Sequence, residues 1–155
     1  MAIDKMTREH VPLPPLVCAC ASLRRAARAV TQAYDAELRT TGMNPTQFTL
    51  LHFLSRSGEV SQGELGQHLA IDTTTLTRTL EPLRKSGWIR VRSGDDRRER
   101  RWSLTPAGER KRIEVAPHWE AAQARLRAKI GARRFQSLLS ELAVVAKAVR
   151  DTGET

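Results

Sequence analysis

The stretch Asp72-Thr73-Thr74-Thr75-Leu76-Thr77-Arg78-Thr79-Leu80 has the pattern of a helix with one apolar and one polar face. Asp72 is a suitable N-cap, because its carboxylate can accept hydrogen bonds from the unpaired N–H groups of the first turn. A period of 3.6 residues groups Thr73, Leu76, Leu80 and Leu83 on one face, and Thr74, Arg78 and Lys85 near the opposite one. Short polar side chains and an arginine suit contacts with base edges and phosphates in a DNA major groove, although a solvated helix surface is the simpler interpretation of this helix alone.

The residues just before this stretch predict a second, shorter helix. Ser61-Gln62-Gly63-Glu64 matches a capping box, and Leu65 and Leu69 are its inward-facing residues. Ala70-Ile71 then provides a tight turn to Asp72, which gives a helix-turn-helix pattern. Gly87 is expected to end the second helix, and Pro82 to loosen its last turn.

After Gly87 the periodicity changes from that of a helix to that of a strand. Residues 88–92 and 101–104 are predicted to form two strands joined by the arginine-rich segment 93–100. A helix-turn-helix followed by such a hairpin is a winged helix, and arginines at the tip of a wing can enter the minor groove. A solvated loop is the alternative for these arginines. The predicted DNA-binding residues of helix and wing are Thr73, Thr74, Thr75, Thr77, Arg78, Lys85, Asp96, Arg97, Arg98 and Arg100.

Helices are predicted on both sides of this unit. Residues 1–14 lack periodicity and suggest an extended arm, a first helix follows to about Gly42, and Asn44-Pro45 begins a second that ends near Ser57-Gly58. Thr105-Pro106 begins a long helix that Pro117 is expected to kink, and a last helix follows Gly131. Its apolar residues, at steps of three and four, are Phe135, Leu138, Leu142, Val145 and Val149.

These elements predict a mainly α-helical single domain, residues 1–155, with a small β-hairpin wing. The winged helix-turn-helix lobe spans about residues 44–104, flanked by helices over about 15–42 and 105–150. A winged-helix core does not need these flanking helices for burial, so we expect them to form a homodimer interface. Packing within one chain is the alternative.

The basic charge of the chain is concentrated in one region. The net charge is +9, and residues 84–112 hold eleven Lys or Arg against four Asp or Glu. Such a patch attracts double-stranded DNA, and an anionic membrane surface is the weaker alternative because no amphipathic helix with exposed Trp or Phe accompanies it. No apolar run is long enough for a membrane span and no signal-peptide pattern is present, so a cytoplasmic protein is expected.

The order of elements and four short motifs resemble the MarR family of bacterial transcriptional regulators. The resemblance covers about residues 16–150, and its most specific part runs from the wing into the following helix. The matching segments are Thr77-Arg78, Lys85-Ser86-Gly87-Trp88-Ile89, Asp96-Arg97-Arg98 and Ser103-Leu104-Thr105-Pro106-Ala107-Gly108. The chain departs from the family pattern at Pro82 and at Arg100-Arg101-Trp102.

The resemblance implies a homodimer that binds a palindromic operator, usually as a repressor, and is released by a small phenolic or aromatic effector or by cysteine oxidation. It also implies that Asp96 orients Arg98 toward the minor groove. Family ligands occupy a cleft between the dimerisation helices and the winged lobe, which on this chain points to Cys20, Arg24, Phe48 and His52. His52 is also interpretable as an ordinary, partly buried core histidine.

Two other functions fit the same sequence. Cys18 and Cys20 suggest a thiol- or metal-switched regulator, although a small buried hydrophobic role is the more common one for a free cysteine, and two thiols within one helix would point about 200° apart. A winged-helix module that binds protein or RNA is the second alternative. No enzyme is predicted, because no phosphate loop, nucleophile motif or metal-ligand motif is present, and neither a metal nor a cofactor is expected.

Overall fold

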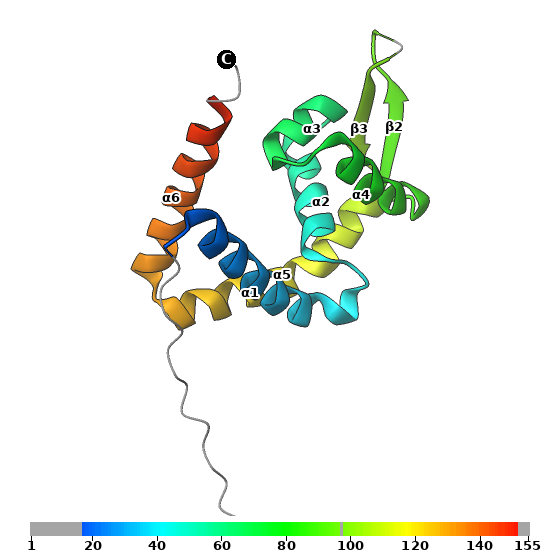
Figure 1. Ribbon diagram of the computed structural model, residues 1–155. Helices are drawn as coiled ribbons and strands as arrows, with labels where there is room; N and C mark the ends of the chain where they lie inside the picture. The colour runs from blue at the N-terminus through cyan, green and yellow to red at the C-terminus, as the bar shows by residue number, and fades with distance from the viewer. Residues whose placement is uncertain (1–16, 97, 152–155) are drawn as a thin grey trace, which may run out of the picture.

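The computed structural model describes residues 17–96 and 98–151, and it is mainly helical with one small antiparallel sheet (Figure 1). The predicted arm over residues 1–14 and the side chain of Arg97 lie outside the described residues. In chain order the elements are α1 (Ala19–Leu38), η1 (Arg39–Thr41), α2 (Pro45–Ser57), β1 (Val60–Ser61), α3 (Gln62–Leu69), α4 (Thr73–Lys85), β2 (Ile89–Ser93), β3 (Arg100–Leu104), α5 (Pro106–Ile130) and α6 (Ala132–Asp151).

The helix starts follow the capping residues that the sequence predicts. Asn44 and Ser61 both form complete capping boxes, with Gln47 and Glu64 respectively. Asp72 caps α4, and Thr105 caps α5 by accepting from the Gly108 N–H at 3.0 Å. These local bonds fix where each helix of the lobe begins.

The core of the molecule lies inside the helix-turn-helix lobe. The buried faces of α2, α3 and α4 meet the inner face of the sheet there, and α5 covers them through Val115. The fully buried side chains are Leu38, Phe48, Leu50, Leu51, Leu54, Leu65, Leu76, Leu80, Leu83, Ile89 and Val115. As predicted, Leu76, Leu80 and Leu83 form the inward face of α4, whereas Thr73, which was grouped with them, is exposed.

The sheet has three strands in the order β1-β3-β2 and is one strand larger than predicted. β2 and β3 form the expected hairpin, with Ile89 paired to Leu104 at its base and Ser93 paired to Arg100 near its tip. β1 adds two residues to the other edge of β3, with Val60 opposite Trp102. The hairpin is therefore joined to the lobe along one of its edges.

The flanking helices form a second part of the molecule. α5 leaves the lobe, α1 packs along it, and α6 begins at its far end and turns away from the α5 axis (Figure 1). α5 continues through Pro117 as one helix, so the proline does not end it. The expectation of buried cysteines is wrong, because Cys18 and Cys20 are both exposed and α1 begins only at Ala19.

Candidate nucleic-acid interface

The N-terminal half of α4 exposes a polar surface whose cap is held by its own side chains. Asp72 accepts from the Thr75 N–H at 2.9 Å and from the Thr75 hydroxyl at 2.6 Å. The hydroxyl bond is the main reason why the pKa of Asp72 is lowered. The carboxylate therefore stays charged at neutral pH and fixes the start of the helix.

The predicted recognition residues of α4 divide into two groups. Thr75 is engaged with Asp72, and the Thr77 hydroxyl donates to the Thr73 carbonyl at 2.8 Å. The side chains of Thr73, Thr74 and Arg78 are exposed and have no hydrogen bond or ion pair among the described residues. Together with Lys85, which is exposed at the end of α4 and has no ion pair in the described structure, they remain available to a ligand.

A residue that the sequence reasoning missed connects α4 to the wing. The Gln62 amide donates to the Thr77 hydroxyl at 3.0 Å and accepts from the indole N–H of Trp102 at 3.2 Å. Trp102 is almost fully buried, so this bond also satisfies the indole N–H. α3 thus links α4 and β3 through one side chain.

The tip of the wing is a turn closed by backbone bonds. The Gly94 N–H donates to the Glu99 carbonyl at 2.8 Å, and the Asp96 carboxylate accepts from the backbone N–H of Arg98 at 2.9 Å. Asp96 therefore orients the backbone at Arg98. The Arg98 and Arg100 side chains are exposed and carry no ion pair among the described residues.

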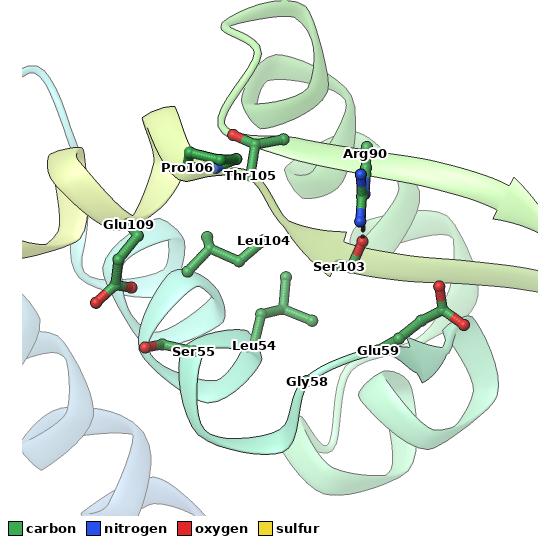
Figure 2. A pocket seen from close by; sticks show the side chains of 10 residues that line it. All are labelled: Leu54, Ser55, Gly58, Glu59, Arg90, Ser103, Leu104, Thr105, Pro106 and Glu109. Carbon is green, nitrogen blue, oxygen red and sulfur yellow. Dashed lines mark hydrogen bonds between the residues drawn. The ribbon is translucent and has the colours of Figure 1, made fainter.

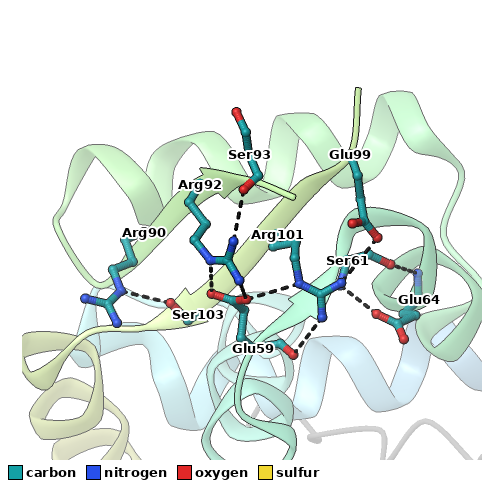
Figure 3. A network of polar contacts seen from close by, with 9 residues as sticks. All are labelled: Glu59, Ser61, Glu64, Arg90, Arg92, Ser93, Glu99, Arg101 and Ser103. Atoms are coloured by element: carbon teal, nitrogen blue, oxygen red, sulfur yellow. Dashed lines mark hydrogen bonds and ion pairs between the residues drawn. The ribbon is translucent and has the colours of Figure 1, made fainter. Parts of the chain in front are cut away.

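Acidic residues neutralise part of the basic cluster over residues 84–112. Arg84 pairs with Glu81, Lys111 with Glu114 and Arg112 with Glu109. At the base of the wing, Glu59 pairs with both Arg92 and Arg101 (Figure 3). Among the described residues, the basic side chains of this cluster without an ion pair are Lys85, Arg90, Arg98, Arg100 and Arg110. Three of them, Lys85, Arg98 and Arg100, are predicted from the sequence to bind DNA.

The predicted effector residues are brought together only in part. Phe48 and His52 lie on α2 and stack with Trp119 of α5, with ring centroids 5.5–6.0 Å apart. Burial lowers the pKa of His52, and its Nδ1 is buried with no partner in the described structure. Cys20 and Arg24 are exposed on α1 and do not join this cluster. Sequence reasoning missed Trp119, which belongs to a helix distant in the chain.

Two clefts flank the end of α2. One of about 330 Å³ lies between α2 and α3 and includes His52 and His68 in its lining. The other, of about 670 Å³, lies between α2, the base of the hairpin and the start of α5 (Figure 2). Its lining includes Leu54, Glu59, Arg90, Leu104 and Glu109.

Within residues 17–96 and 98–151, three or more metal-ligating His, Cys, Asp or Glu side chains nowhere gather into one group. Over those ranges, no helix has the length and apolar content that crossing a membrane requires.

A helix-turn-helix followed by a hairpin, with free polar and basic side chains on both, defines a winged helix-turn-helix protein. A sequence model of the MarR family matches residues 41–99. YwoH of Bacillus subtilis (strain 168), an uncharacterized HTH-type transcriptional regulator, is 30% identical over 93 residues, which cover 60% of this chain and 68% of YwoH. The chain belongs to the MarR family of transcriptional regulators, a family of regulators and not of enzymes.

Solved structures agree with this assignment. The M. tuberculosis transcriptional regulator MosR, crystallised in complex with DNA, is 39% identical, with a TM-score of 0.74 over 86% of this chain and 98% of MosR. The transcriptional repressor CouR, bound to a 23-mer DNA duplex, has a TM-score of 0.75 over 83% of this chain and 92% of CouR. At 24% identity, CouR supports the fold alone.

Proposed function

We propose that this chain is a cytoplasmic, homodimeric repressor that binds a palindromic operator and is released by a small aromatic or phenolic ligand. The observation that carries the proposal is the pairing pattern of the basic side chains. Arg78 on α4 and Arg98 and Arg100 on the wing are exposed and have no ion pair among the described residues, whereas Arg84, Arg92, Arg101 and Arg112 are held by carboxylates. α4 enters the major groove and the wing tip enters the adjacent minor groove.

The dimer is supported by the apolar face of α6. Phe135 is buried against α5, but the apolar side chains further along the helix are solvent-exposed in the single chain. Those above one-third exposure are Leu138, Leu139, Leu142, Val144, Val145 and Val149, with Leu23 on α1. An exposed apolar surface made of so many large side chains indicates a protein–protein interface. A dimer with a two-fold axis would place one lobe on each half-site of a palindromic operator.

The DNA contacts are tested by fluorescence anisotropy at several salt concentrations. The duplexes are the promoter regions of the chain's own gene and its neighbours. Arg98→Ala is expected to weaken binding to every sequence and to reduce the salt slope by about one, whereas Arg78→Ala costs about 1–3 kcal/mol and relaxes base preference. Lys129→Ala, the same loss of charge on the far end of α5, is the control. Unchanged affinity in both arginine variants would contradict the proposal, and a lack of sequence preference at any salt concentration would favour a protein- or RNA-binding module.

The dimer is tested separately by sedimentation equilibrium. Leu142→Glu places a charge on the apolar face of α6 and is expected to shift the protein toward monomers and to weaken operator binding. Lys147→Glu is the control, because it introduces the same side chain on α6 at a position that is already polar. A Leu142→Glu variant that remains fully dimeric would place the interface elsewhere.

The effector is tested with a panel of aromatic acids and phenols. The stacked Phe48, His52 and Trp119 rings between α2 and α5 are the proposed binding region, because an aromatic ring can pack against them. A compound that releases the wild-type protein from DNA should lose at least about tenfold in potency against Trp119→Ala. Equal potency against both proteins would remove this region as the effector site.

A thiol-switched regulator is the second candidate, and the exposure of both cysteines favours it. Cys18 is the extended N-cap residue of α1, so it lies outside the helix that carries Cys20 and can change its backbone angles independently. Peroxide would oxidise the two thiols to a disulfide, or one to a sulfenic acid, with reduction of peroxide to water. If the double Cys18→Ser, Cys20→Ser variant still leaves DNA on peroxide treatment, this mechanism is wrong.

A further inference from the structure

Two arginines at the base of the wing are directly opposite each other on neighbouring strands. Arg92 of β2 and Arg101 of β3 are register partners, one step from the pair Ser93 and Arg100 that closes the hairpin near its tip. Like charges in opposite positions destabilise a two-stranded pair. The hairpin therefore needs a counter-charge at the point where its tip begins.

Glu59 supplies that counter-charge from outside the hairpin. Its carboxylate accepts from Arg92 Nε at 2.8 Å, with a second bond from Arg92 Nη2, and from Arg101 Nε at 3.1 Å (Figure 3). The Arg101 guanidinium also donates to the Glu59 backbone carbonyl at 3.5 Å and to the Glu99 carboxylate at 3.2 Å. The hydrogen bond from Arg92 is the main reason why the pKa of Glu59 is lowered.

Glu59 belongs to the lobe and not to the wing. It lies between the last residues of α2 and β1, only two residues after Ser57. Other links between lobe and hairpin include the pairing of β1 with β3 and the bond from Trp102 to Gln62, both on the β3 side. At the base of the hairpin, β2 also packs against α4, and its first residue, Ile89, is buried in the core. Through Arg92, Glu59 adds a charged contact between the lobe and β2, the outer strand of the sheet, on the tip side of this buried base.

We infer that Glu59 is a positioning residue for DNA binding, which braces the wing so that Arg98 meets the minor groove at the correct angle. At about 3.3 Å per residue, the tip of the hairpin extends about 10 Å beyond the contact with Glu59, so a small rotation at this contact moves the tip. A rotation of about 10° at Glu59 then displaces the tip by about 2 Å, which is enough to break a hydrogen bond to DNA. Glu59 and Arg101 are also less exposed than the other pairs of the wing, with side-chain exposures of 29% and 28%, so salt screens their contact less.

The inference rests on the proposed wing contact, and a double-mutant cycle separates the two. The probe is the tightest-binding duplex recovered from a randomised library, bound by the full-length protein. Glu59→Gln keeps the size of the side chain but removes its charge, and we expect it to weaken binding about three- to tenfold. Arg98→Ala should cost less in the Glu59→Gln background than in wild type, because a displaced wing has already lost that contact. Arg78→Ala should cost the same in both backgrounds.

Glu114→Gln is the matched control, since it removes the same charge from a carboxylate that pairs with Lys111 on α5 and is itself 63% exposed. The added positive charge alone should slightly strengthen binding in both variants, so a loss confined to Glu59→Gln supports the brace. Two results overturn the inference: Glu59→Gln binding like Glu114→Gln, or losses from Glu59→Gln and Arg98→Ala that simply add. If Arg98→Ala has no effect even in wild type, the proposed wing contact itself is wrong. Should Glu59→Gln fail to fold, Arg92→Gln must show the same non-additivity with Arg98→Ala.

Discussion

Replacing Gly108 by alanine adds only one methyl group, yet we expect this change to lower the stability of the fold strongly. A Cβ at this position would overlap the carbonyl oxygen of Trp88 and would lie 2.7 Å from Leu104 Cδ1. The same Trp88 oxygen accepts from the N–H of Thr105 at 3.0 Å and from its hydroxyl at 3.1 Å. The contact is with backbone at the start of the wing, so it cannot be relieved by a side-chain rotation. Gly108→Ala therefore forces α5 away from the hairpin.

The size of the effect follows from these contacts. Overpacking costs about 1–3 kcal/mol, and weakening the two bonds to Trp88 costs about 1 kcal/mol each. The better helix propensity of alanine returns about 1 kcal/mol. We therefore expect Gly108→Ala to lower the free energy of unfolding by about 2–4 kcal/mol, and the Tm by about 5–15 °C.

Urea unfolding, followed by circular dichroism at one fixed protomer concentration, measures this change. Gly63→Ala is the control, because a Cβ there has only the Ser61 hydroxyl near it, at 3.9 Å. That variant should be neutral or up to about 1 kcal/mol more stable. The packing argument is refuted if Gly108→Ala unfolds within about 0.5 kcal/mol of wild type.

Two further predictions test the Asn44 cap and the half-buried His52. Asn44→Ala removes the bond to the Gln47 N–H at 2.9 Å and should cost about 1 kcal/mol in urea unfolding, while Asn44→Asp should cost little; equal losses would mean that the cap is not the cause. Burial, with the charges of Arg112 and Arg56, lowers the pKa of His52 below its ordinary 6.5, so the folded state disfavours the protonated ring. The contribution of His52 to the free energy of unfolding is therefore fully present above pH 6.5 and is lost as the pH falls below that value. When the Tm is measured from about pH 7.5 down to about pH 5.5, it should fall less for His52→Phe than for wild type.

The parts of the fold that depend on neighbouring residues could be predicted from sequence. Asn44, Ser61, Asp72 and Thr105 were each expected to begin a helix, and each does so through a bond that spans three residues. The wing was predictable for the same reason, because a change of period and a turn-forming segment are both local signals. The family assignment is confirmed by the MarR model over residues 41–99, together with the relatives YwoH and MosR.

What could not be predicted depends on contacts between distant residues. β1 is two residues long and exists only because β3, some 40 positions later, pairs with it. Glu59 meets Arg92 and Arg101 at separations of 33 and 42 residues, which no periodicity reveals. A buried position was expected for the cysteines because that is the common role of a free cysteine, but both thiols are exposed in the single chain, and Cys18 precedes the helix. The DNA-binding and effector residues remain predictions.

The single side chain of Gln62, bonded to both α4 and β3, has a consequence for how such regulators diversify. Because its amide satisfies Thr77 on one side and Trp102 on the other, the two surfaces proposed to contact DNA are fixed to each other within the lobe. Base preference then belongs to the lobe, whereas in the proposed dimer the distance between the two half-sites would be set by the flanking helices α1, α5 and α6. A chimera that joins the flanking helices of one relative to the lobe of another should prefer a different distance between the two operator half-sites, while the preferred half-site sequence stays unchanged.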